Sequence, residues 1–177
     1  MQIASLITKG IDTELYVRLS KKGDKQAFER LIQNNKASMY RIALSILSNK
    51  EDIEDAIQNT IVKSYVEIIN LKKDEYFKTW LTRILLNECN SILKRNKRSI
   101  PIYDLKENTY FIETFHNLEL TNAVNSLEYD LRIITTLFYF EDMPQKEIAK
   151  LLNIPEGTVR SRLSRARNKL YEILKDA

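Results

Sequence analysis

Apolar residues recur every three or four positions along most of this sequence, the spacing that places them on one face of an α-helix. The pattern predicts helices over residues 24–47, 51–69, 77–95, 122–139, 145–152 and 158–174. It lapses over residues 71–76, where we predict a short loop, and over 99–120, where Pro101 cannot continue a helix and we predict a linker. The expected fold class is all-α, with two small helical domains joined by that linker.

The predicted helices of the first half each have one apolar face. In the helix over 51–69 the inward positions are Ile53, Ala56, Ile57, Thr60, Ile61, Ser64, Tyr65 and Ile68. The opposite side of this helix carries Asp52, Asp55, Asn59 and Lys63. In the helix over 77–95 the inward face includes Cys89, which we interpret as a core residue and not as a nucleophile.

Composition removes several classes of function. The 177 residues include only three glycines and three prolines, which disfavours a turn-rich β fold or a βαβ nucleotide fold. One cysteine and one histidine are too few for a disulfide or a structural zinc site. Nothing in the sequence resembles a nucleophile–base pair, and we find no glycine-rich phosphate loop. We therefore predict a protein that is not an enzyme and that uses no metal or cofactor. Because no long apolar run or signal-peptide pattern occurs, we expect it in the cytoplasm.

The charged residues are sorted into blocks along the chain, although the net charge is only +4. Carboxylates gather over residues 51–55, and cations gather over 94–98 and 160–169. Between Pro101 and Asp130, six carboxylates against one lysine give a net charge of −5. Two basic segments on either side of an acidic connector indicate two modules that each meet a polyanion. The alternative is that each block is a solvated helix face, and for 94–98 alone that interpretation is preferred.

The most specific motif covers residues 144–170, PQKEIAKLLNIPEGTVRSRLSRARNKL. A short helix containing the small Ala149 is followed by Asn153, a residue type that tolerates positive φ, and then by a second helix that Thr158 can cap. The inward positions of the second helix are Val159, Leu163, Ala166 and Leu170. Two short helices joined by a tight turn in this way are typical of a helix-turn-helix.

The exposed face of the second helix in this motif carries donors for phosphates and base edges, since arginine binds either of them bidentately. The predicted DNA-binding residues are Thr158, Arg160, Ser161, Arg162, Ser164, Arg165 and Arg167. Which arginines read bases and which hold phosphates stays open at this point. Helix-turn-helix folds also serve as protein-interaction modules, but a basic face with hydroxyl groups favours DNA.

A second group of residues combines aromatic rings with cations. Tyr76, Phe77 and Trp80 lie at the start of the helix that ends in the basic block over 94–98. Aromatic faces beside cations hold unpaired bases by stacking while the cations neutralise the phosphates. Taken singly, Phe77 and Trp80 are more typical of core residues, and the cations of a solvated helix end. The combination favours binding of unpaired nucleic acid.

Together these residues resemble the bacterial RNA polymerase sigma factors of the extracytoplasmic function (ECF) group, in the sigma-70 family, from about Asp24 to Leu174. The match to the family's segment for the upstream, minus-thirty-five element is carried by Glu147, Ile148, Ala149, Gly157, Thr158, Val159, Ser161, Arg162, Leu163, Arg165, Ala166 and Arg167. The resemblance implies that the downstream, minus-ten element is bound by Lys72, Lys73, Tyr76, Phe77, Trp80, Arg83, Asn87, Lys94 and Arg95. It also implies that core polymerase is bound by Asp52, Glu54, Asp55, Gln58, Asn59 and Lys63.

The same resemblance divides the chain into an N-terminal segment over 1–23, a sigma-2-like domain over 24–98, an acidic linker over 99–120 and a sigma-4-like helix-turn-helix domain over 121–177. Three residues depart from the family pattern: Asn59 stands where Glu is usual, Ser91 where Asp is frequent, and Asn153 where Gly is frequent. The first departure bears on the polymerase contact. The second leaves the end of the third helix without its usual carboxylate, and the third is conformationally conservative.

The resemblance implies a protein that binds core RNA polymerase and directs promoter recognition, promoter melting and transcription initiation. Its expected partners are the polymerase core, promoter DNA and an anti-sigma factor, commonly membrane-anchored, with no small-molecule substrate. The acidic linker is expected to pass near the active-site cleft of the polymerase. The alternative is an operator-binding helix-turn-helix regulator that acts without polymerase, since both classes contain a motif like that over 144–170. The first domain, with its acidic helix, aromatic rings and basic block, favours the sigma factor.

Overall fold

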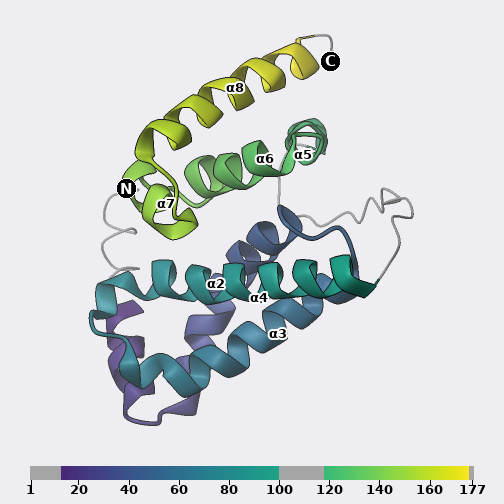
Figure 1. Ribbon diagram of the computed structural model, residues 1–177. Helices are drawn as coiled ribbons and strands as arrows, with labels where there is room; N and C mark the ends of the chain where they lie inside the picture. The colour runs from purple at the N-terminus through teal and green to yellow at the C-terminus, as the bar shows by residue number, and fades with distance from the viewer. Residues whose placement is uncertain (1–12, 100–117, 176–177) are drawn as a thin grey trace. The chain divides into compact units, whose positions relative to one another are not determined.

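The computed structural model describes residues 13–99 and 118–175, and every regular element in them is helical (Figure 1). The prediction of an all-α fold is confirmed. The chain divides into two compact units, one containing Met1–Tyr40 and Glu51–Pro101 and the other containing Arg41–Lys50 and Ile102–Ala177. Most of the predicted linker over 99–120 lies outside the described residues.

The first unit begins with a helix over residues 13–21. Gly23, at φ +92°, ends this helix by adopting a backbone conformation that favours glycine, and its amide donates to the carbonyl of Ser20. The carboxylate of Asp24 then accepts a hydrogen bond from the amide of Ala27 at 3.0 Å, which caps the next helix. The helices that follow are α2 (Lys25–Leu44), α3 (Lys50–Glu67), the short η1 (Ile68–Asn70) and η2 (Asp74–Tyr76), and α4 (Phe77–Ser99).

Most side chains that the apolar pattern assigned to the core of this unit are buried. On α3 they include Ile53, Ala56, Thr60 and Ser64. The prediction for Tyr65 is wrong, because this side chain is 42% exposed, although its ring packs edge-to-face with that of Phe28 at a centroid distance of 5.0 Å. On α4 the predicted inward residues Leu81, Ile84, Leu85, Cys89 and Ile92 are all buried.

Cys89 offers a direct test of this core. Its side chain is fully buried, and this burial raises the pKa of the thiol to about 12, so that the reactive thiolate is scarce at neutral and mildly alkaline pH. We expect the native protein to resist an aromatic disulfide reagent and to react with one equivalent of it once denatured. The release of the coloured thiol measures both reactions, and a native rate equal to the denatured rate would place Cys89 outside the core.

The second unit contains α5 (Leu118–Asn125), α6 (Tyr129–Thr135), a π-helical turn η3 (Thr136–Phe140), α7 (Gln145–Leu152) and α8 (Glu156–Leu174). The prediction of one helix over 122–139 is wrong, since the chain turns at residues 126–128 between α5 and α6. The turn buries Leu127 against Leu131 and Ala166, and the Arg132 guanidinium donates to the carbonyl of Asn125 at 2.7 Å. The burial of Leu127 and the hydrogen bond from Arg132 therefore stabilise a turn at a place where local periodicity favours a continuous helix.

The helix-turn-helix prediction agrees closely with α7 and α8 (Figure 1). Asn153 follows α7 in the left-handed conformation, at φ 54° and ψ 49°, as its residue type predicted. The predicted capping role of Thr158 is wrong. Helix α8 begins at Glu156, two residues earlier than predicted and directly after the extended Pro155, so Thr158 lies inside the first turn of the helix. The carbonyl of Thr158 accepts a hydrogen bond from the hydroxyl of Ser161.

Candidate nucleic-acid interface

Helix α8 presents one polar face to solvent. Its opposite side is fixed by Val159, Leu163 and Ala166, which are all buried. Helical geometry therefore directs four exposed residues outward in one row, namely Ser161, Ser164, Arg165 and Asn168. This row contains the hydroxyl groups of Ser161 and Ser164 and the guanidinium of Arg165, which are donors suited to base edges in the major groove.

The two flanks of α8 differ in how strongly their cations are engaged. On one flank, the guanidinium of Arg162 lies 2.5 Å from a carboxylate oxygen of Asp130 on α6, and the Arg162 side chain is only 23% exposed. On the same flank Lys169 pairs with Glu128 at 2.6 Å, and this hydrogen bond lowers the pKa of Glu128 below its ordinary value. Two carboxylates at the start of α6, Glu128 and Asp130, therefore pair with the cations on one flank of α8.

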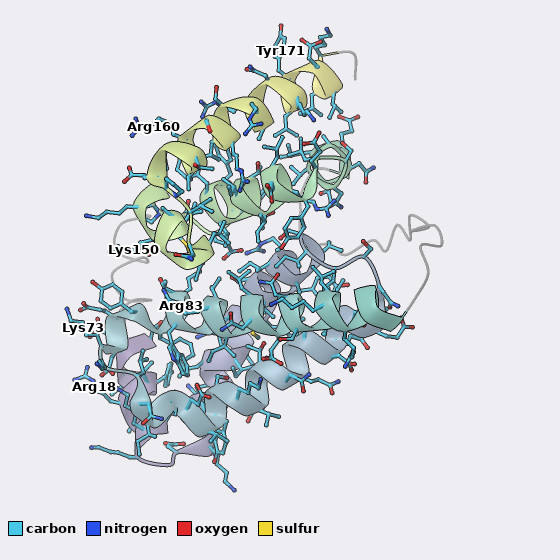
Figure 2. All side chains as sticks on the ribbon, viewed as in Figure 1. Arg18, Lys73, Arg83, Lys150, Arg160 and Tyr171 are labelled. Atoms are coloured by element: carbon cyan, nitrogen blue, oxygen red, sulfur yellow. The ribbon has the colours of Figure 1, made fainter. Side chains whose placement is uncertain are left out.

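The other flank is more open. Arg160 pairs with Glu156 one turn earlier at 3.8 Å, yet its side chain is 73% exposed, and Figure 2 shows it directed away from α6. Arg167 donates to the hydroxyl of Tyr139 at 3.4 Å and is also exposed. A loose contact of this kind leaves a cation available for a phosphate, because exposed ion pairs contribute little stability.

Sequence reasoning missed two cations on α7. Lys146 and Lys150 are exposed and one helical turn apart, and helical geometry places them on the side opposite the buried Ile148. They flank a shallow, open depression of the surface at the turn before α8, which Asn153, Ile154 and Pro155 also line. The first helix of a helix-turn-helix crosses the DNA backbone, so this position suits phosphate contacts. Their spacing of four residues was the available signal.

Helix α4 in the first unit carries a second exposed row. Arg83, Asn87 and Lys94 are exposed at positions that share one face of the helix, and the half-buried Trp80 lies at the start of this face. Phe77 is fully buried, so the structure assigns it to the core, where its ring supports Trp80 at a centroid distance of 5.9 Å. Phe77 therefore cannot stack on a base as the sequence analysis expected. Arg95 lies 4.0 Å from the carboxylate of Asp52.

The loop before α4 adds polar and aromatic groups to this row. Lys72, Lys73 and Tyr76 are exposed, and the Lys73 ammonium lies 5.5 Å from the centroid of the Tyr76 ring. A cation over an aromatic face joins a charge for phosphate to a surface for stacking. The loop and the exposed row of α4 therefore form a continuous candidate surface for unpaired bases.

The residues predicted on α3 separate into two groups. Glu54, Asp55, Gln58 and Asn59 are exposed. By contrast, Asp52 accepts a hydrogen bond from Asn96 at 2.8 Å and Lys63 donates to Glu88 at 2.6 Å, so these two side chains tie α3 to α4. The structure thus gives Asp52 and Lys63 a role within the unit.

The outer face of α3 continues in a way that sequence reasoning missed. Asp55 and Gln58 lie on one line with Val62 and Val66, and Ile69 in η1 extends it. The three apolar side chains are 63%, 68% and 66% exposed. Their spacing at i, i+4 and i+7 away from the buried face was the available signal. One helix face therefore changes from acidic to apolar along its length, which is typical of a protein-binding surface.

Comparison with known proteins identifies the family. Residues 31–99 match the family model described as Sigma-70 region 2, and residues 117–170 match the model described as Sigma-70, region 4. The ECF RNA polymerase sigma-E factor of Haemophilus influenzae is 30% identical, covering 82% of this chain and 86% of that protein. The chain is an ECF sigma factor of the sigma-70 family.

Other relatives of this sigma factor extend over nearly its whole length. The RNA polymerase sigma-H factor of Pseudomonas aeruginosa is 28% identical over 96% of both chains. Among solved structures, the sigma factor RpoE in complex with the anti-sigma factor NepR from Bartonella quintana has a TM-score of 0.69 and 25% identity, covering 84% of this chain and 96% of that one. Region 2 of the sigma factor corresponds to α2–α4, and region 4 to α5–α8; the helix over 13–21 precedes both matched segments.

No helix among the described residues of this sigma factor is long and apolar enough to span a membrane. Within the same residues, no group of three or more His, Cys, Asp or Glu side chains could hold a metal ion.

Proposed function

We propose that this sigma factor directs transcription initiation by joining core RNA polymerase through α3 and by contacting two promoter elements, one through each domain. The observation that carries the proposal is the order of three exposed surfaces along one chain that matches both sigma-70 regions: the outer face of α3, the row on α4 with its loop, and the outward row of α8. The domains that we propose are residues 24–98 and 121–177, joined by the acidic linker over 99–120.

The proposed polymerase contact uses the outer face of α3. Asp55 and Gln58, with Glu54 and Asn59 beside them, supply its polar half, and Val62, Val66 and Ile69 supply its apolar half. The carboxylates would steer the chain to basic residues of the polymerase, and the apolar half would exclude water once docked. Asp52 and Lys63 support this face by fixing α3 against α4.

The proposed downstream contact combines Lys72, Lys73 and Tyr76 of the loop with α4. Trp80 and Tyr76 offer rings on which unpaired bases can stack, while Arg83, Asn87 and Lys94 follow the strand along the helix. Capture of bases that leave the duplex would favour the open form of the promoter, because bound bases cannot re-pair. Neither covalent chemistry nor a cofactor is needed for this step.

The proposed upstream contact places the outward row of α8 in the major groove. Ser161, Ser164 and Arg165 would face base edges, while Arg160 and Arg167 on the open flank, and Lys146 and Lys150 on α7, would hold phosphates. Once α3 is docked, the two DNA contacts act at high effective concentration, so neither needs to be tight alone.

The proposal includes an anti-sigma factor that covers these surfaces, since the similar RpoE structure is a complex with one. We propose that this partner is membrane-anchored and that the sigma factor acts in the cytoplasm with the polymerase. The alternative function, an operator-binding regulator that works without polymerase, is disfavoured by the match of residues 31–99 to Sigma-70 region 2.

The testing experiment mixes the purified chain with sigma-free core polymerase and follows the mixture by size-exclusion chromatography. We expect co-elution, and we expect the complex to enrich promoter sequences from a random duplex library and to transcribe from them. A chain that shifts duplex DNA alone but never co-elutes with polymerase of its own source would support the operator-binding regulator.

A further inference from the structure

The helix over 13–21 precedes both matched segments, and the sequence analysis gave it no function. This helix nevertheless packs into the core of the first unit. Val17 is fully buried and Ser20 is 6% exposed, which anchors one face of the helix in the core. The turn at Gly23 ends the helix, and the backbone amides of this turn donate hydrogen bonds to the carbonyls of Leu19 and Ser20. Lys21 therefore occupies the last helical turn, where the helix dipole favours a cation.

The side chain of Lys21 leaves its own helix and reaches the loop before α4. Its ammonium donates to the carbonyl of Leu71 at 2.5 Å and to the carboxylate of Asp74 at 2.6 Å, across 50 and 53 positions of sequence. Both charged side chains of the pair are 22% exposed, so the contact is partly shielded from water. Arg18, one turn earlier, lies 4.0 Å from the second oxygen of Asp74. Figure 2 shows Arg18 and Lys73 at the same end of the first unit.

These contacts hold both ends of a short exposed segment. Leu71 is buried and its carbonyl is bound, while Asp74 begins η2 and is held by two cations. Between these two points lie the exposed Lys72 and Lys73, and Tyr76 follows at the end of η2. A loop held at two points loses less conformational entropy when it orders around a ligand, so its affinity for that ligand is higher.

We infer that Lys21 is a positioning residue for promoter opening: through Leu71 and Asp74 it holds the loop over 71–76 in the form that receives unpaired bases. The inference rests on the proposed function. It assigns to the helix over 13–21 a part in base capture without contact to the DNA. It also gives the carboxylate of Asp74 a structural role beside the exposed Lys72 and Lys73, because this carboxylate is paired with Lys21 and Arg18. The second carboxylate of the segment, Glu75, is exposed and lies 3.7 Å from the ammonium of Lys73.

The test compares Lys21→Met with Lys22→Met, a matched control in which the neighbouring exposed lysine loses the same charge. Each variant is assembled with core polymerase and given the promoter duplex that the wild-type complex enriched. Permanganate, which oxidises unpaired thymines, measures opening of the downstream element. We expect Lys21→Met to lower promoter opening by about three- to tenfold. A loss of this size lies between that of an exposed ion pair and that of a buried hydrogen bond to a charged group, because the contact is only partly shielded from water. Lys22→Met and the conservative Lys21→Arg should open the promoter as the wild type does.

Two further measurements separate positioning from folding. Co-elution with polymerase and binding of the isolated upstream duplex should be unchanged in Lys21→Met. Adding Asp74→Asn to Lys21→Met should reduce promoter opening little further, because the two substitutions remove the same contact. Opening equal to that of Lys22→Met would overturn the inference, as would an equal loss of every activity together with a lower melting temperature. If the wild-type complex itself enriches no promoter, the proposed function has failed, and this is visible before any variant is compared.

Discussion

Replacement of Arg165 with alanine is expected to weaken binding of the upstream promoter element by about 1–3 kcal/mol and to relax sequence preference at one position. The physical reason is its place in the outward row of α8, between Ser161 and Asn168 and opposite the buried Leu163. A guanidinium in this position can reach two acceptors of one guanine, which is the most common specific contact in the major groove.

Arg162 on the same helix supplies the comparison. Its guanidinium is held 2.5 Å from Asp130, which keeps it from reading a base. Arg162→Ala would leave that carboxylate without its cation and make the DNA-binding face less positive, so we expect lower affinity for all sequences alike, with little change of preference. Fluorescence anisotropy on the enriched element and on single-base variants, repeated across salt concentrations, distinguishes the two effects. A loss of preference in Arg162→Ala with none in Arg165→Ala would show that the pair with Asp130 is exchanged for a base in the complex.

Introduction of a carboxylate at Val62 is expected to weaken the complex with core polymerase by about 2–4 kcal/mol, the range of a hot-spot residue. Val62 is 63% exposed and begins the apolar half of the outer face of α3, one turn after Gln58 of the polar half and one turn before Val66. Docking would bury this position, and Val62→Asp would then place an unpaired charge in the interface. Asp55→Lys, at the acidic end, should act mainly on the association rate and its salt dependence.

Two substitutions elsewhere in the first unit provide matched controls. Leu15→Asp makes a similar change at another exposed apolar side chain, and Glu29→Lys reverses an exposed charge on α2. Both should bind polymerase as the wild type does. Charge reversal of Asp52 is a poorer test, because it also breaks the hydrogen bond from Asn96 and disturbs the packing of α3 on α4. Equal polymerase affinity for Val62→Asp and Leu15→Asp would refute the proposed docking face.

Local patterns were sufficient for much of this fold. The period of apolar residues predicted α7 at its observed bounds and α2 and α4 within a few residues of theirs, because a helix must direct its apolar side chains to one side. Residue chemistry predicted the left-handed turn at Asn153 for an equally local reason. The family resemblance, carried by the motif over 144–170, was also present in the sequence alone, and the match to region 4 covers that motif.

Other features depended on segments that are distant in the sequence. The predicted helix over 122–139 is divided because burial of Leu127 beneath α8 outweighs helical continuity. The aromatic cluster suggested three stacking rings, but the position of Phe77 against its neighbours buries one of them. Exposure of a single ring is decided by the elements that pack around it, and a periodic pattern does not contain that information.

The sequence by itself determined the helical class of this protein, its helix-turn-helix and its membership in the ECF sigma factors, since each depends on residue types at short, regular spacing. Only the tertiary structure decided which charges remain available. It paired Arg162 with Asp130 and Lys21 with Asp74, and it left the face that carries Asp55, Val62 and Val66 exposed. Ion pairs between elements and the solvent exposure of a helix face arise when separate helices pack together, so no local stretch of the chain specifies them.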